Sequence, residues 1–128
     1  MKYARFFLSV TILAVLCAQA TMAQEKATEK LGNVHFPVSC SNEAQQQFDR
    51  AVAILHSFWY EEAVKAFTAA TEADPNCAMG QWGIAMSIYY PLWVPPDQAT
   101  LQKGLSAVEK AKSIGAKTER ERAYIAAI

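Results

Sequence analysis

The sequence predicts an all-α protein. Apolar residues recur at the three- and four-residue spacing of a helix face in several stretches between residues 42 and 128. Prolines, glycines and polar clusters separate these stretches, and no run alternates apolar and polar residues as a half-buried strand does. We therefore expect helices joined by turns, without a sheet.

The first 23 residues have the three parts of a secretory signal peptide. Lys2 and Arg5 make the start positively charged, an apolar run (FFLSVTILAVLC) occupies residues 6–17, and small residues follow it. The run is shorter than the roughly 20 residues of a membrane-spanning helix, so we expect no stable anchor after cleavage. The predicted location is the periplasm or the outside of the cell.

Two cleavage sites compete. Ala18 and Ala20 form the cleaner match to the small-residue motif, whereas Ala23 leaves a more usual spacer after the apolar run. We favour cleavage after Ala23. Cys17 is a weak candidate for lipid attachment, because Leu16 before it is not a small residue.

Charge disfavours a nucleic-acid partner. Without Lys2 and Arg5 the 12 basic residues become 10, against 12 acidic residues, so the mature chain has a net charge of −2. It has no basic stretch that could follow a phosphate backbone. Residues 117–122 alternate in sign, which is typical of a solvated helix face.

The mature chain begins with a polar and irregular lead-in at residues 24–41, which contains Gly32 and Pro37. Asn42 is the predicted cap of a first helix, with Gln45 completing a capping box. This helix is interrupted near residues 56–59. A second helix is expected from about Tyr60 to Ala73, where the sequence Asp-Pro-Asn ends it.

Three further helices are expected. One runs from about Cys77 to Tyr90, before a segment with three prolines. The next is capped by Asp97 and ends near Ser113, and Gly115 after it suits a left-handed C-cap. Thr118 and Glu121 form a capping box that opens the last helix. Since that helix has no ending signal, we expect the sequence to be the N-terminal part of a longer protein.

The first and third helices match when shifted by 34 residues. The matched pairs are Ala44 with Ala78, Gln47 with Gln81, Phe48 with Trp82, Ala51 with Ala85, and Ile54 with Ile88. A 34-residue period of helix–turn–helix units is the tetratricopeptide (TPR) spacing. The second helix resembles that family as well, through Ala63, Phe67 and Ala70 followed by the Asp74-Pro75 ending.

The second unit is a variant of the first. Gly104, Val108 and Ala111 repeat the spacing of the small–aromatic–small positions, at an offset of 41 residues. The seven extra residues fall in the proline-rich turn. The first helix departs from the family pattern at Gln47 and Arg50, and a bulky Ser-Phe-Trp sequence replaces the usual glycine before the turn. A helical hairpin bundle with chance periodicity is the competing interpretation.

The resemblance implies antiparallel helix pairs stacked as a TPR-like α-solenoid, with about two and a half pairs over residues 42–128. It also implies a concave face that binds a protein or peptide partner. The residues expected on this face are Phe48, Val52, Leu55, Met79, Trp82, Met86, Tyr89 and Tyr90. Later repeats or the lead-in are an alternative covering for it. The lysine, asparagine and arginine residues with which some family members grip a C-terminal carboxylate are absent from these positions.

Cys40 and Cys77 are predicted to form a disulfide. An even pair of cysteines in an exported chain suggests a bond. Each of the two lies at the start of the first helix of a repeat, and such helices are neighbours in a TPR-like stack. Two buried free thiols are the alternative.

No pattern of catalytic or metal-binding residues is present. His35 and His56 have no partner at ligand spacing, and there is neither a C-x-x-C motif nor a glycine-rich phosphate loop. Glu61 and Glu62 are adjacent and so point to different helix faces. The sequence therefore predicts an interaction scaffold, with no enzyme activity and no cofactor. The alternative is an accessory region of a larger exported enzyme or assembly, whose chemistry lies beyond residue 128.

Overall fold

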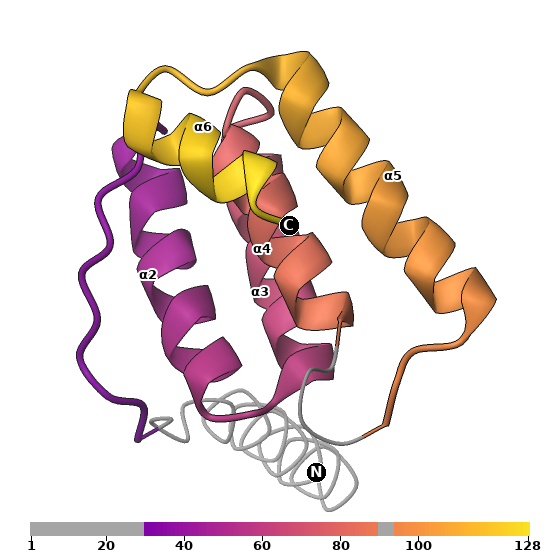
Figure 1. Cartoon of the computed structure of the whole chain (residues 1–128). Helices are drawn as coiled ribbons and strands as arrows, with labels where there is room; N and C mark the ends of the chain where they lie inside the picture. The colour runs from indigo at the N-terminus through magenta and orange to yellow at the C-terminus, as the bar shows by residue number, and fades with distance from the viewer. Residues whose placement is uncertain (1–29, 90–93) are drawn as a thin grey trace, which may run out of the picture. The chain divides into compact units, whose positions relative to one another are not determined.

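The computed structural model describes residues 30–89 and 94–128, and the account below concerns the unit Leu31–Ile128. The predicted signal peptide, the start of the lead-in and Tyr90 lie outside the described residues. Within them every regular element is a helix, which confirms the all-α prediction for this part of the chain (Figure 1). The helices are α2 (Asn42–His56), α3 (Tyr60–Ala73), α4 (Ala78–Ile88), α5 (Gln98–Ile114) and α6 (Glu119–Ala126).

The predicted helix boundaries are close to those in the structure. Helix α3 begins and ends at the predicted residues, and α4 ends at Ile88, slightly before the predicted end. The Asp97 side chain accepts a hydrogen bond from the backbone N–H of Thr100 at 2.7 Å and caps α5. Gly115 has a φ of 79° after α5, a conformation that glycine adopts without steric cost. Thr118 opens α6 with the predicted capping box.

The cap of α2 differs from the prediction. Ser41, rather than Asn42, accepts a hydrogen bond from the backbone N–H of Ala44, at 3.2 Å. Gln45 completes no capping box, because its side-chain amide bonds to the backbone of Phe36 and Val38 instead. The Gln45 side chain, which the sequence predicts to cap the helix, therefore bonds to the lead-in instead.

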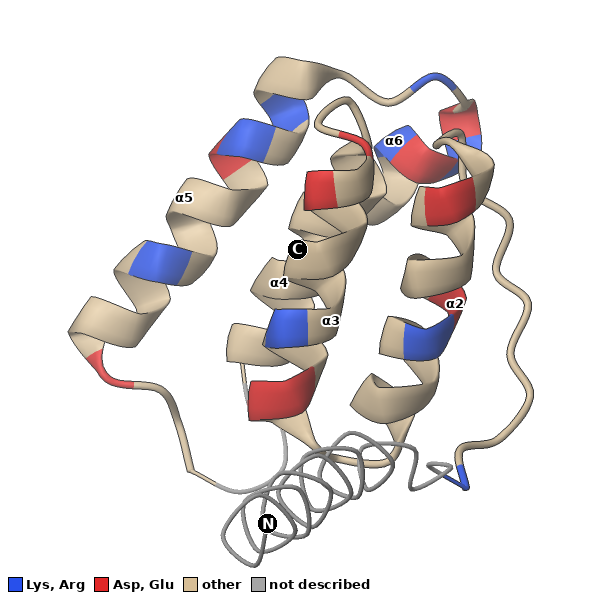
Figure 2. Ribbon diagram, turned by 180° about the vertical axis from the view of Figure 1, so that it is seen from behind, with Lys and Arg blue, Asp and Glu red and all other residues tan. Residues whose placement is uncertain are grey.

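The helices pack mainly in chain order. Contacts join α2 to α3, α3 to α4 and α4 to α5, and further contacts join α4 to α2 and to α6. Figures 1 and 2, seen from opposite sides, place α3 and α4 between α2 and α5, with α6 across the ends of α2 and α4. Charges of both signs lie on the other helices, whereas α4 has none, as befits the central helix (Figure 2).

Two glycines let α4 approach α3 closely. A Cβ atom at Gly83 would lie 2.2 Å from Cδ1 of Phe67, and one at Gly80 would lie 2.6 Å from Cγ2 of Thr71. Real Cβ atoms do not come this close to a neighbour, so α3 and α4 can meet here only without side chains at these two positions. The core beside this contact is aromatic, since Phe48 and Phe67 are fully buried and their ring centroids lie 5.3 Å apart.

Candidate interaction site

The predicted concave face is mostly covered, and the groove assignment is wrong for several of its residues. Phe48, Val52 and Met79 are at most 5% exposed and belong to the core. Leu55 is half-buried against the same core. The physical reason is that the lead-in folds back over α2, which helical periodicity within each helix does not reveal. Covering of the face by the lead-in is one of the alternatives that the sequence leaves open.

The covering segment is Leu31–Ser39, which we call the strap. It has no regular secondary structure and runs alongside α2 (Figure 1). The Phe36 ring lies among three other rings, with centroid distances of 5.6 Å to Phe48, 6.2 Å to Trp82 and 5.2 Å to Tyr124. These three partners come from α2, α4 and α6. One strap residue therefore bridges alternate helices of the chain.

Side chains of α2 hold the backbone of the strap. The backbone N–H of Phe36 donates to Oδ1 of Asp49 at 2.9 Å, and the carbonyl of Phe36 accepts from Nε2 of Gln45 at 2.9 Å. The backbone N–H of Val38 donates to Oε1 of Gln45 at 2.8 Å. Gln45 also donates to Asp49 at 2.8 Å, which fixes the orientation of both side chains.

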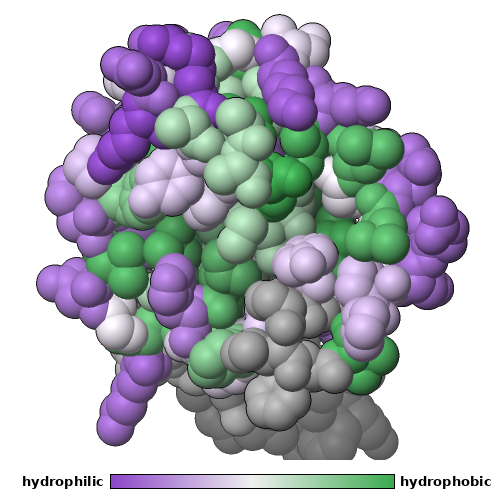
Figure 3. Space-filling model, viewed as in Figure 1, coloured by the Kyte–Doolittle hydropathy of each residue, from purple (hydrophilic) through white to green (hydrophobic). Residues whose placement is uncertain are grey.

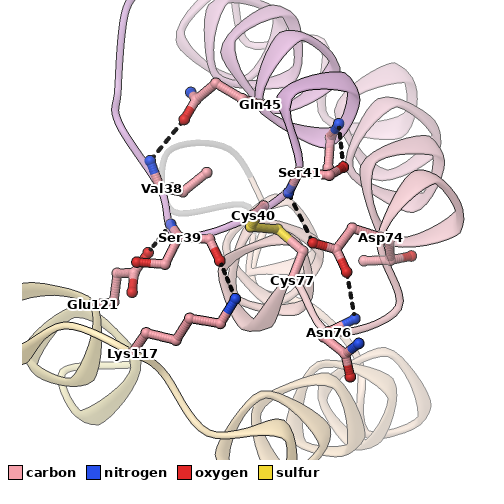
Figure 4. Close-up of a disulfide and its surroundings, with 12 residues drawn as sticks. Val38, Ser39, Cys40, Ser41, Gln45, Asp74, Asn76, Cys77, Lys117 and Glu121 are labelled. Carbon is pink, nitrogen blue, oxygen red and sulfur yellow. Dashed lines mark hydrogen bonds between the residues drawn. A yellow bond between two sulfur atoms is a disulfide. The ribbon is translucent and has the colours of Figure 1, made fainter.

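Helix α6 and the turn before it hold the other end of the strap. The carboxylate of Glu121, only 2% exposed, accepts a hydrogen bond from the backbone N–H of Ser39. Lys117 donates to the carbonyl of Ser39 at 3.0 Å (Figure 4). Arg120 donates to the carbonyl of Pro37, and its guanidinium lies 4.9 Å from the centroid of the Phe36 ring.

Glu121 is held in its charged form. Burial acts to raise the pKa of this carboxyl, but hydrogen bonds from the backbone N–H groups of Ser39 and Thr118 outweigh burial and leave the pKa below its ordinary value. The same carboxylate completes the capping box of α6. Sequence reasoning found the capping role and missed the contact with Ser39, since nothing local relates residues so far apart in the chain.

Cys40 and Cys77 form a disulfide, as the sequence predicts. Their Sγ atoms are 2.06 Å apart and their Cα atoms 5.0 Å apart. The bond joins Cys40, which directly follows the strap, to Cys77, which directly precedes α4, and Figure 4 shows it flanked by hydrogen bonds. The backbone N–H of Ser41 donates to Asp74 at 2.9 Å, and Asp74 also accepts from the backbone of Asn76.

An open pocket lies beside the covered face. Its volume is about 550 Å³, and it is lined by Trp82, Met86, Tyr89, Tyr124, Ala127 and Ile128. Three of the predicted groove residues are among these, and Tyr89 is 56% exposed. Trp82 and Tyr124 also contact Phe36 of the strap, so the pocket continues the aromatic surface that the strap covers.

A smaller hollow of about 280 Å³ lies between α4 and α5 and shares Tyr89 and Ile128 with the larger pocket. Leu101 and Leu105 line it and are 42% and 49% exposed. Figure 3 shows hydrophobic side chains gathered on this face, between α4, α5 and α6. Exposed apolar side chains beside a hollow make this face a candidate for contact with another chain.

The histidines have structural partners. Nδ1 of His35 lies 3.2 Å from Oδ2 of Asp49, and Nδ1 of His56 lies 2.9 Å from the carbonyl of Val52. In residues 30–89 and 94–128, no group of three or more His, Cys, Asp or Glu side chains is arranged to hold a metal ion. The helices of that part of the chain are all too short or too polar to cross a membrane.

Comparison with known proteins finds no match, whether to a family model, to a curated protein or to a solved structure.

Sequence reasoning missed Phe36 as a central residue of this site. The signal available for it is weak, because one aromatic residue in a short apolar stretch (VHFPV) is also typical of an ordinary loop.

Proposed function

We propose that this chain is an exported, TPR-type interaction scaffold that binds a segment of a partner protein in the open pocket beside the strap. The observation that carries the proposal is the pocket itself. Two tyrosines, a tryptophan and a methionine line a hollow large enough for one or two side chains. Aromatic residues and methionine are enriched in the centres of protein interfaces, and methionine adapts to different partners.

Several observations support the TPR-type part of the proposal. The small–aromatic–small positions of both units, Ala63, Phe67 and Ala70 and their counterparts Val108 and Ala111, are buried where consecutive helices meet. Helix α4 contacts both α2 and α6, as first helices of successive repeats do in a solenoid. Gly104 lies against Ile88, at the position of the small residue that lets two helices cross.

The signal-peptide pattern and the disulfide support export into an oxidising compartment, the periplasm or the exterior. Disulfides persist in such compartments and are rare in a reducing cytosol. The second candidate function, a helical accessory region of a larger exported enzyme or assembly, is compatible with the same pocket. It differs in predicting that the bound segment belongs to a domain of the same assembly.

A peptide-binding measurement tests the proposal. The oxidised mature chain is screened against an array of ten-residue peptides that contain one large apolar residue, and the best binder is titrated by fluorescence anisotropy. The Met86→Ala, Tyr89→Ala double variant should weaken binding at least tenfold while its circular dichroism shows that it is still folded at the assay temperature.

Phe58→Ala is the matched control. Phe58 is 52% exposed, close to the 56% of Tyr89, but it lies in the turn between α2 and α3 and does not line the pocket. It should leave the affinity unchanged. Equal losses in both variants, or the absence of any binder in the array, would show that the pocket is not a peptide site.

A further inference from the structure

The strap lies on the protein in the manner of a bound extended peptide. Val34, Phe36 and Val38 are half-buried, whereas His35 and Pro37 between them are exposed, which is the two-residue alternation of an extended chain. Gln45 and Asp49 bond to the backbone of the half-buried positions. Hydrogen bonds to backbone N–H and carbonyl groups suit an extended chain of almost any sequence, because nearly every residue has these groups.

Selectivity comes from the side chain of Phe36. Its ring touches aromatic rings from three different helices, and the guanidinium of Arg120 lies over its face. A smaller aliphatic residue would leave these rings without their edge and stacking contacts. The surface is therefore built for an extended segment with an aromatic residue at one position and aliphatic residues two positions to either side.

We propose that the surface under the strap is a second peptide-binding site, that the strap is its tethered occupant, and that the Cys40–Cys77 disulfide keeps it closed. The partner is an extended segment with an aromatic residue that replaces Phe36 among the rings of Phe48, Trp82 and Tyr124. This inference rests on the proposed peptide-binding role of the face and adds the ligand class and a means of control.

The disulfide is placed to control the strap. Ser39, the last strap residue, is followed directly by Cys40, so the bond to Cys77 fixes the position from which the strap leaves α2. A tethered segment acts at an effective concentration in the millimolar range, well above that of a partner in solution. The disulfide holds the strap in register and so keeps its effective concentration high. Reduction of the disulfide lowers that effective concentration.

Opening is a two-electron reduction. A thiolate of a dithiol attacks one sulfur of the Cys40–Cys77 bond, forms a mixed disulfide with that cysteine and releases the other cysteine as a thiolate. The second thiolate of the dithiol then attacks its own sulfur in the mixed disulfide, closes a cyclic disulfide and releases the first cysteine. Cys40 and Cys77 are left as two thiols. The strap then stays only through its hydrogen bonds and the Phe36 contact, and a partner segment competes with it.

Peptide binding to the mature chain tests the proposal. The probe is a fluorescein-labelled peptide with the sequence of residues 30–39 (KLGNVHFPVS), and the control peptide has alanine in place of its phenylalanine. With dithiothreitol the chain should bind the probe at least tenfold more tightly than without it, and the control peptide should not bind. The Cys40→Ser, Cys77→Ser double variant should bind the probe equally well with and without dithiothreitol.

Amide hydrogen exchange of the peptide-free chain gives the second readout. Reduction should speed exchange at Phe36 and Val38 at least tenfold more than at the amides of α3 and α4, which lose only the protection that the lower global stability removes. Equal probe binding in the oxidised and reduced chains would overturn the proposal. Equal loss of protection in the strap, α3 and α4 would also overturn it, because the strap would then be an inseparable part of the core.

The two proposals fail in different ways. If the reduced chain ignores the probe while the oxidised chain still binds array peptides through Met86 and Tyr89, the site under the strap does not exist and the open pocket stands. The opposite result is that the reduced chain binds the probe while the Met86→Ala, Tyr89→Ala variant binds its array peptides normally. That result would support the site under the strap and show that the open pocket is not a peptide site.

Discussion

The carboxylate of Glu121, in the first turn of α6, accepts a hydrogen bond from the backbone N–H of Ser39, which lies 82 residues earlier in the chain. The same carboxylate accepts from the backbone N–H of Thr118 at 3.2 Å. One buried acidic side chain therefore closes the strap and caps the helix beneath it.

Glu121→Gln should destabilise the protein by about 1–3 kcal/mol at pH 7, because one of the two backbone donors loses a charged acceptor in a buried place. The folded-state pKa is below the ordinary value of about 4.3, so this contribution is complete above that value and is lost as the pH falls through the folded-state pKa. Denaturant unfolding of wild type and variant at pH 7 and pH 3 measures the loss of stability and its dependence on pH. The difference between wild type and variant should shrink at the lower pH, and a constant difference would contradict the charged state of Glu121.

The disulfide closes a loop with a sequence separation of 37 residues. The Cys40→Ala, Cys77→Ala double variant should lose about 3–4 kcal/mol of unfolding free energy in the chain-entropy model. Guanidinium unfolding without reductant measures the loss. Thiol titration of the denatured, unreduced wild-type mature chain should find no free thiol, and two free thiols per chain would show that the bond is absent.

Gly83→Ala should destabilise the protein by about 1–3 kcal/mol, since the added Cβ would lie 2.2 Å from the buried Phe67 ring and force α3 and α4 apart. Gly104→Ala is the matched control within a helix. Its Cβ would lie 3.5 Å from Cγ2 of Ile88, an ordinary contact, and alanine favours a helix by about 0.5–1 kcal/mol over glycine. The melting temperature should therefore fall for Gly83→Ala and stay the same or rise for Gly104→Ala. The same shift in both would contradict the close contact of α3 with α4.

Export of the full-length chain should remove residues 1–23. Edman sequencing of the protein recovered from the periplasm or the medium should begin at Gln24. An intact Met1 on protein recovered from the cytosol would contradict the prediction. Replacing Ile12 and Val15 in the apolar run with arginine should block export, because an apolar run is what the export machinery recognises.

The fold was predictable where the signals are local. Proline at position 75 cannot continue a helix, so the end of α3 follows from the sequence. Thr118 and Glu121 bond to each other within one turn, and the start of α6 follows in the same way. The Cys40–Cys77 pair was predictable because the 34-residue shift that matches the first and third expected helices leads us to expect their starts to be neighbours.

The site was less predictable because it depends on the strap. The pattern of α2 shows that Phe48 and Val52 share a face, but not whether that face meets solvent or another segment. Ser41 and Asn42 are equally good helix caps, and the choice between them depends on Gln45, which the strap engages. Tyr89 is the C-cap residue of α4, is 56% exposed and lines the open pocket.

The strap also imposes an order on the folding of a newly made chain. Phe36 is made before any of its partners, and Tyr124 is made last. Synthesis proceeds at about 5–20 residues per second, so the 82 residues between Ser39 and Glu121 take about 4–16 s to appear. Until then the strap lacks its hydrogen bonds with Lys117, Arg120 and Glu121 and its contact with the Tyr124 ring. The N-terminal part of the unit is thus the first to be made and the last to be completed.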